Sequence, residues 1–247
     1  MASTSVSRTL NEIKVLLAVF AHPDDEVMVA GTLSRLKAFG TEIHVLYATK
    51  GEDGPTGGLV DQADLGTERM KELNEVSKII GYDTMEVLDY PDRYLPTIPD
   101  AEFRKIVIDH IQKFEPDTVI CFDGSIGLYG NADHAYTGRN VIEVFRDESY
   151  GVERLMIMTL PKVLIKLALR LSTTFKERYD QGRPLPPANF AVRISGFARQ
   201  KRAVMKAHRT QWQVLNDVMP FWDKMPPEIY HQLFANEYFT LVDLSTR

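Results

Sequence analysis

The segment Ala21-His-Pro-Asp-Asp-Glu26 joins a short apolar run to a helical pattern. Residues 14–20 have the length and composition of a buried strand, and residues from about 25 to 39 carry apolar side chains at helical spacing, with Gly40 as the stop. In an open α/β sheet, ligands bind at such strand-to-helix turns. One imidazole and three carboxylates at this turn indicate a metal site. The alternative is that the two aspartates only cap the helix and complement its dipole.

Apolar runs and helical patterns alternate along the first 150 residues. Strands are predicted at 14–20, 41–48, 85–88 and 117–122, and helices at 67–80, 100–114 and from about Asp133. This alternation is typical of right-handed βαβ units and a parallel sheet. We therefore expect an α/β fold, a Rossmann-like doubly wound, mostly parallel sheet flanked by helices, with the first and fourth strands adjacent at the switch point.

The pattern weakens after residue 150. A fifth strand is predicted at 154–159, and helices at 161–173 and 197–209. Because neither a repeat nor a linker interrupts the chain, we expect one domain over 1–247, with its core at about 14–150 and a variable C-terminal part at 151–247.

A second polar motif, Gly127 to His134, follows the fourth predicted strand. It belongs to the same edge of the sheet, so His134 can approach His22 and Asp25. Two imidazoles and one carboxylate, with a position left open for water, form the catalytic zinc pattern. A structural zinc site usually has four ligands, often thiolates, and the single Cys121 argues against one.

Together these motifs resemble the PIG-L/LmbE-like superfamily of zinc-dependent N-acetylglucosaminyl deacetylases. The resemblance rests on Ala21–Glu26 and Asp133-His134, and extends to the segments 49–54, 69–72, 88–92 and 206–211. It implies a hydrolase that removes an N-acyl group, in the first place N-acetyl, from an amino sugar or glycoconjugate. The alternative is a protein that holds a sugar on the same metal-site fold with little or no catalysis.

The resemblance implies roles for the central residues. His22, Asp25 and His134 would bind one zinc ion per chain, with another divalent metal as an option. Asp24 would act as general base, taking a proton from water and passing one to the leaving amine.

Five further residues match the family pattern less closely. Tyr129 would help to stabilise the oxyanion, with simple packing as the alternative. Asn131 stands where relatives commonly carry a histidine that serves the oxyanion. His208 is either a late member of the active site or a helix-end charge. Arg69 and Asp92 would contact sugar hydroxyls, with a surface ion pair and a turn residue as the alternatives.

Charge and composition limit the partners. The net charge of −5 is unevenly distributed. Residues 1–150 carry 14 basic and 26 acidic side chains, a charge of −12, and residues 151–247 carry 15 basic and 8 acidic side chains, a charge of +7. The basic part lacks the regular arginine and aromatic interleaving of nucleic-acid binders. No uncharged stretch has transmembrane length, and no signal pattern opens the chain, so we expect a cytoplasmic protein without a membrane partner. The charge asymmetry and the apolar helix at 161–173 favour a homo-oligomer, a trimer or hexamer as is frequent in the family.

A nucleotide-binding Rossmann domain is a poor alternative. Its first strand-to-helix turn would be rich in glycine, whereas this turn would present carboxylates to a pyrophosphate.

Overall fold

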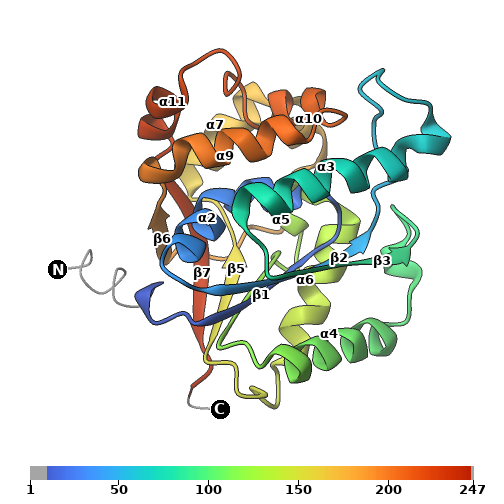
Figure 1. Cartoon of the computed structure of the whole chain (residues 1–247), viewed down its shortest axis with the longest axis vertical. Helices are drawn as coiled ribbons and strands as arrows, with labels where there is room; N and C mark the ends of the chain where they lie inside the picture. The colour runs from blue at the N-terminus through green and yellow to red at the C-terminus, as the bar shows by residue number, and fades with distance from the viewer. Residues whose placement is uncertain (1–9, 246–247) are drawn as a thin grey trace.

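The computed structural model describes residues 10–245 and is organised around one seven-stranded sheet (Figure 1). The sheet order is β3-β2-β1-β4-β5-β7-β6. Strands β1 to β5 run parallel, and β7 runs antiparallel to both β5 and β6. The strands are β1 Val15–Phe20, β2 Glu42–Thr49, β3 Thr84–Tyr90, β4 Thr118–Cys121, β5 Arg154–Met158, β6 Phe190–Arg193 and β7 Asn236–Asp243. The predicted α/β fold is confirmed, as is the pairing of the first strand with the fourth.

Strand β1 is apolar throughout because both faces of the sheet are covered. Leu16, Ala18 and Phe20 belong to the core on one face, and Leu17 and Val19 to the core on the other. All five side chains are fully buried.

Helices form a layer on each side of the sheet (Figure 1). Helices α2 Ala30–Ala38, α3 Leu65–Ile80 and α9 Ala198–Ala207 pack against one face. Helices α4 Asp100–Phe114 and α6 Ala132–Val144 cover the other. The remaining helices are α5 Gly127–Gly130, α7 Lys162–Leu171, α8 Thr173–Arg178, α10 Trp212–Val218 and α11 Pro227–Leu233, with 3₁₀ turns η1 Asp25–Val29, η2 Gln62–Asp64, η3 Leu95–Thr97 and η4 Ser195–Phe197.

Two features differ from the sequence-based expectation. The helix predicted from about residue 25 to 39 is divided into η1 and α2, because Asp25 hydrogen-bonds the backbone at the end of β1 before regular α-helix begins. Strands β6 and β7, and the short helices α5, α8, α10 and α11, are absent from the sequence-based expectation. The pattern of β7 is obscured because a glutamate, Glu237, occupies one of its buried positions.

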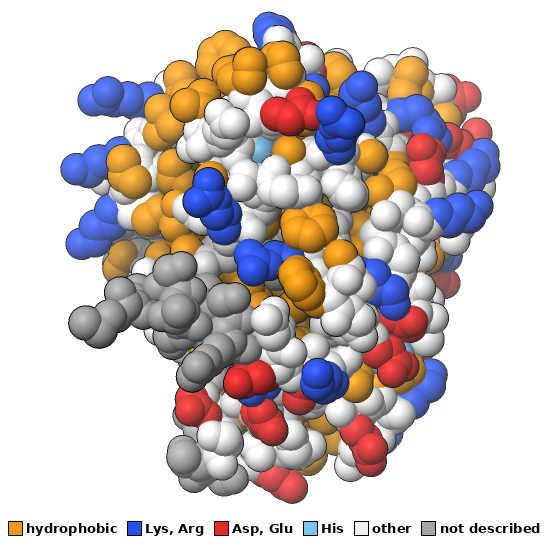
Figure 2. Space-filling model, turned by 60° about the vertical axis from the view of Figure 1, so that its left-hand side comes forward, with side chains coloured by type: hydrophobic (Ala, Val, Ile, Leu, Met, Phe, Trp, Pro, Cys, Tyr) orange, Lys and Arg blue, Asp and Glu red, His pale blue; other side chains and the backbone are white. Residues whose placement is uncertain are grey.

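Hydrophobic side chains are present at the surface as well as in the core. Figure 2 shows them gathered on the upper part of one face. Helix α7 has no buried residue, and Val163 on it is 70% exposed. Within residues 10–245, no helix is long and apolar enough to cross a membrane. Residues 1–9, on which the expectation about a signal pattern partly rests, lie outside the described residues.

Candidate metal centre and active site

Three of the predicted residues converge at the carboxyl edge of β1 and β4. Nε2 of His134 lies 3.0 Å from Oδ1 of Asp25 and 3.1 Å from Nδ1 of His22. Nδ1 of His22 lies 3.7 Å from Oδ2 of Asp25. All three residues are buried, and one ligand atom from each lies within 4.8 Å of the others. The three side chains can therefore bind one ion together.

The turn after β1 is built to hold Asp25 in this place. Oδ2 of Asp25 accepts hydrogen bonds from the backbone N–H of Ala21 at 3.0 Å and of His22 at 2.7 Å. Asp24 has a φ of 100°, a left-handed conformation that is unfavourable for a residue with a side chain. The local hydrogen bonds stabilise this strained turn and leave the Asp24 side chain lining a cleft.

The second ring nitrogen of His22 meets two other carboxylates. Nε2 lies 3.1 Å from Oδ1 of Asp92 and 3.2 Å from Oδ2 of Asp133. A metal-binding imidazole commonly donates its other N–H to a carboxylate, which fixes the ring and its tautomer. His22, Asp92 and Asp133 are themselves close enough to form a second metal-binding group. The group of His22, Asp25 and His134 fits zinc better, because it offers two imidazoles and one carboxylate. Asp92 and Asp133 can then hold the other side of the His22 ring.

The charges around the site perturb its pKa values. Burial lowers the pKa of His22, but the carboxylates of Asp133, Asp25 and Asp92 raise it more, so it lies well above the usual range. Burial raises the pKa of Asp25, but the imidazoles of His134 and His22 hold it far below the usual range. In the metal-free protein His22 therefore tends to carry a proton, and a metal ion must displace that proton to bind the ring nitrogen.

Asp24 lies beside the converging ligands and pairs with Arg69. Oδ1 of Asp24 accepts a hydrogen bond from Nη2 of Arg69 at 2.8 Å. Burial raises the pKa of Asp24 above its usual value, and the charge of Arg69 opposes this rise. A buried carboxylate with a raised pKa is a better proton acceptor than an exposed one.

Arg69 has a structural role that the sequence did not reveal. It is 3% exposed and also donates to the carbonyls of Gly51, at 2.9 Å, and Pro23. Its guanidinium thus holds two loops around Asp24. Arg69 lines the cleft as well, so its contact with sugar hydroxyls stays a prediction.

Asp92 likewise joins loops at the edge of the cleft. Its Oδ2 accepts a hydrogen bond from the N–H of Asp53 at 3.1 Å, and its own N–H donates to Glu52 at 2.9 Å. The next residue, Arg93, donates its N–H to Asp133 at 2.7 Å. Sequence reasoning assigned no role to Asp133, although its place directly before His134 was a signal that it belongs to the same helix start.

Asn131 is the N-cap of α6. Its Oδ1 accepts from the N–H of Asp133 at 2.9 Å and of His134 at 3.3 Å. The oxygen is therefore committed to the helix, and only the amide N–H₂ can serve an oxyanion. Asparagine is among the strongest N-cap residues, so its position before a predicted helix was a usable signal.

Tyr129 lines the cleft, and its ring centre lies 5.3 Å from that of His134. Its hydroxyl hydrogen-bonds Asn131, and burial raises the pKa of Tyr129 well above its usual value. The phenol therefore stays neutral and can donate a hydrogen bond at neutral pH.

His208 is placed differently from the other predicted residues. It is fully buried, forms the C-cap of α9 and does not line the cleft. Its Nε2 bonds Glu26, which also accepts from the hydroxyl of Tyr47 at 3.0 Å and the N–H of Asp24 at 3.1 Å. Burial lowers the pKa of His208, but Glu26 raises it more. His208 is therefore joined to Asp24 through Glu26, its charge also lowers the pKa of Asp24, and its part in catalysis stays a prediction.

The cleft has a volume of about 490 Å³, and the candidate ligands and Asp24 all line it. Among the lining residues, Asp92 lies against His22, with 3.1 Å between Oδ1 and Nε2, and Tyr129 lies against His134. These two lining residues flank different ligands of the group, so a molecule whose reacting group meets Asp24 can extend one substituent toward Asp92 and another toward Tyr129.

The family described as PIG-L, GlcNAc-PI de-N-acetylase, has a model that matches residues 17–145, just over half of the chain. The chain is 26% identical to a diacetylchitobiose deacetylase of Thermococcus kodakarensis over 223 residues, 88% of this chain and 77% of the relative. It is 32% identical over 230 residues to a 1D-myo-inositol 2-acetamido-2-deoxy-alpha-D-glucopyranoside deacetylase of a Mycobacterium species. The match covers 81% of this chain and 74% of that relative.

Among solved structures, the N,N'-diacetylchitobiose deacetylase of Pyrococcus horikoshii shares the fold. Its TM-score is 0.71 at 20% identity, over 97% of this chain and 88% of that one. Together with the site, these findings define a hydrolase of carbon–nitrogen bonds. The chain belongs to the PIG-L family.

The N-cap of α6 makes a prediction about stability. Asn131→Ala should lower the free energy of unfolding of the metal-free protein by about 1 kcal/mol, because two N–H groups lose their acceptor. Asn131→Asp keeps a capping oxygen, so its free energy of unfolding should stay within a few tenths of a kcal/mol of wild type. Asn131→His should lose the cap but raise turnover, because it places an imidazole on the oxyanion side. Urea unfolding of the wild type, Asn131→Ala and Asn131→Asp measures these two changes. Equal midpoints for wild type and Asn131→Ala would show that the cap contributes nothing.

The pairing of Arg69 with Asp24 makes a prediction about pH. Because the guanidinium favours the carboxylate form, Arg69→Gln should raise the pKa of Asp24 and move the acidic limb of kcat/KM to higher pH by about one unit. Arg69→Lys keeps the charge and should leave the limb near its wild-type position. An acidic limb that stays in place in Arg69→Gln would exclude Asp24 as the titrating base.

Proposed function

We propose that the protein is a zinc-dependent hydrolase that removes an N-acyl group, in the first place N-acetyl, from an amino sugar or glycoconjugate. The observation that supports this most strongly is the convergence of His22, Asp25 and His134 beside the buried carboxylate of Asp24. The relatives, named as deacetylases of amino-sugar compounds, support the substrate class.

A bound zinc ion would lower the pKa of a water molecule to about 7 and polarise the acyl oxygen. The residues of the chain would do the rest. Asp24 would take the proton of the attacking water, with Arg69 holding its carboxylate in place. The same proton would then pass from Asp24 to the amine as the carbon–nitrogen bond breaks. Tyr129, neutral and within the cleft, would donate a hydrogen bond to the acyl oxygen as negative charge develops there.

We propose that the sugar lies in the cleft beside Asp92. Burial raises the pKa of Asp92, but His22 lowers it more, so Asp92 remains a carboxylate and can accept hydrogen bonds from hydroxyls. Arg69 and Arg93 also line the cleft and can donate. Hydroxyl groups offer both donors and acceptors, so this part of the cleft suits a polyhydroxylated ring.

The competing proposal is a protein that binds a sugar on this fold without hydrolysing it. A released-amine assay over a panel of N-acyl amino sugars distinguishes the two, run on protein stripped of metal by a chelator and then reloaded with zinc. The proposal predicts amine release only after reloading. Sugar binding by zinc-loaded protein, without amine release from any member of the panel, would favour the non-catalytic alternative.

Replacement of the base gives a sharper prediction. Asp24→Asn should retain one zinc per chain but lose about 10²-fold or more in turnover, because general-base catalysis typically contributes that much. Asp89→Asn is the matched control, since Asp89 lies at the end of β3 with its side chain 88% exposed. Turnover near wild type in Asp24→Asn would remove Asp24 from the mechanism, and loss of zinc would show that it serves the metal instead.

A further inference from the structure

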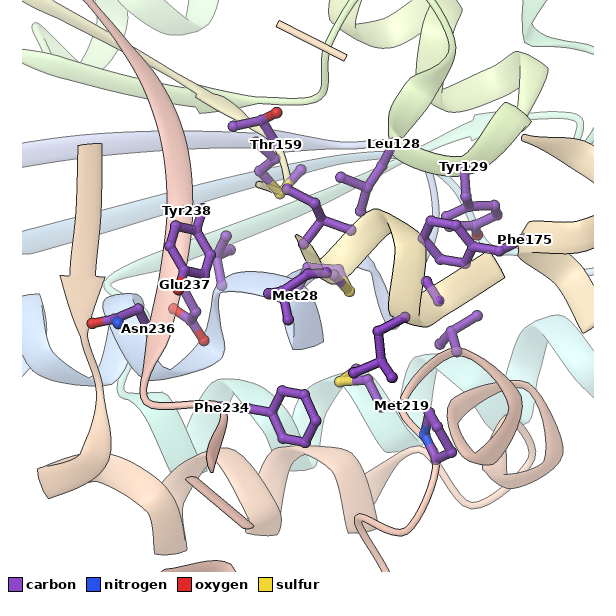
Figure 3. Close-up of a pocket in the computed structure, with 18 of the residues that line it drawn as sticks. Met28, Leu128, Tyr129, Thr159, Phe175, Met219, Phe234, Asn236, Glu237 and Tyr238 are labelled. Atoms are coloured by element: carbon purple, nitrogen blue, oxygen red, sulfur yellow. The ribbon is translucent and has the colours of Figure 1, made fainter. Parts of the chain in front are cut away.

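An apolar cavity of about 150 Å³ lies beside the cleft (Figure 3). Leu128, Tyr129 and Phe175 line it on one side, and Met219 and Phe234 on another. Helix α7 lines it as well, through residues that include Ala168. Nothing in the mechanism proposed above uses this space.

The cavity and the cleft share a wall. Tyr129 lines both, and its ring centre lies 5.8 Å from that of Phe175 and 5.3 Å from that of His134. Helix α8 also contributes to both spaces, with Thr174 on the cleft and Phe175 on the cavity. The cavity therefore begins one aromatic ring away from a candidate metal ligand.

The described residues that line the cavity leave no unpaired charge in it. Lys201 donates to Glu237 at 2.6 Å, and Glu237 also accepts from the N–H groups of Gly31 and Thr32. Burial, with the charges of Lys201 and Arg202, lowers the pKa of His231 to about 4, so this buried ring is neutral. A ligand in this space gains free energy by burying apolar surface and not by ion pairing.

The proposed function fixes which part of a substrate points toward this cavity. A secondary amide is planar and trans, so its nitrogen substituent and its acyl chain extend in opposite directions. With the sugar beside Asp92, which lies against His22, the acyl chain extends past the other histidine, His134, toward Tyr129. The cavity lies on that side.

The geometry points to a substrate whose N-acyl group is longer than acetyl and occupies the apolar cavity behind Tyr129. This inference rests on the proposed function for the place of the sugar. A cavity near 150 Å³ holds a molecule of about six carbon atoms, such as benzene. The acyl group is therefore a straight chain of about this length or a single aromatic ring on a short linker.

Binding to the metal-free protein tests the inference apart from catalysis. N-hexanoylglucosamine has four methylenes more than N-acetylglucosamine, and each buried methylene is worth about fourfold in affinity. Calorimetry should show at least about 30-fold tighter binding of the hexanoyl compound. In zinc-loaded protein, kcat/KM for amine release should rise with acyl length by a similar factor and level off near hexanoyl.

Two variants of α7 locate the effect. Ala168→Phe fills the cavity and should reduce the ratio of hexanoyl to acetyl affinity by at least about tenfold. The affinity for N-acetylglucosamine itself should stay within about twofold of wild type. Val163→Phe adds the same ring to the exposed side of the helix and should leave the ratio unchanged. If Ala168→Phe does not fold, Leu164→Ala enlarges the same cavity and should shift the preferred chain to a longer one.

The outcomes separate the two proposals. Equal binding of acetyl and hexanoyl compounds, or a preference that Ala168→Phe does not change, overturns the inference even if N-acetyl substrates are hydrolysed. Tight, Ala168-dependent binding of the hexanoyl compound without amine release from any substrate supports the cavity while contradicting the proposed function. A matching dependence on Ala168 for octyl N-acetylglucosaminide, but not for the hexanoyl compound, would assign the cavity to an aglycone and overturn the acyl assignment.

Discussion

The carboxylate of Asp25 holds the site together. One oxygen accepts two backbone N–H groups at the end of β1, and the other meets His134 at the start of α6. Because β1 and β4 are neighbours in the sheet, the segments that follow them meet at one edge, where Asp25 of one segment contacts His134 of the other. Asp24 is then forced into a left-handed backbone conformation with its side chain lining the cleft. The candidate metal-binding group and the proposed base thus depend on the same short turn.

A layer of charged groups behind this turn supports it. Asp92 and Asp133 bind the far side of His22, while Glu26 holds the N–H of Asp24 and is in turn paired with His208. These contacts join four separate parts of the chain, so a change far from the cleft can displace the reacting groups. The arrangement is typical of metal sites in which outer carboxylates fix the orientation of the ligands. It also explains why so many acids are buried in a protein that carries its negative charge in residues 1–150.

Much of this could be predicted from the sequence because the relevant signals are local. An apolar strand followed by His22 and Asp25, and a later strand followed by His134, places three potential ligands at one sheet edge once the strand order is assumed. The role of Asn131 as a cap was missed, although residue type and position both indicated it. The pairing of His208 with Glu26 could not be predicted, because the two lie 182 residues apart and meet only through packing of α9. Strand β7 is hidden for a similar reason. Glu237 is buried where the pattern requires an apolar residue, and its distant partners Lys201, Gly31 and Thr32 make that burial acceptable.

We propose that His22, Asp25 and His134 form the metal centre, with Asp92 and Asp133 as its support. Anomalous diffraction at the zinc absorption edge from zinc-loaded crystals tests it most directly. The account predicts one peak per chain, at about 2.0–2.2 Å from a ring nitrogen of His22, a carboxylate oxygen of Asp25 and a ring nitrogen of His134. A peak bound by Asp92 and Asp133 in place of Asp25 and His134 would contradict it.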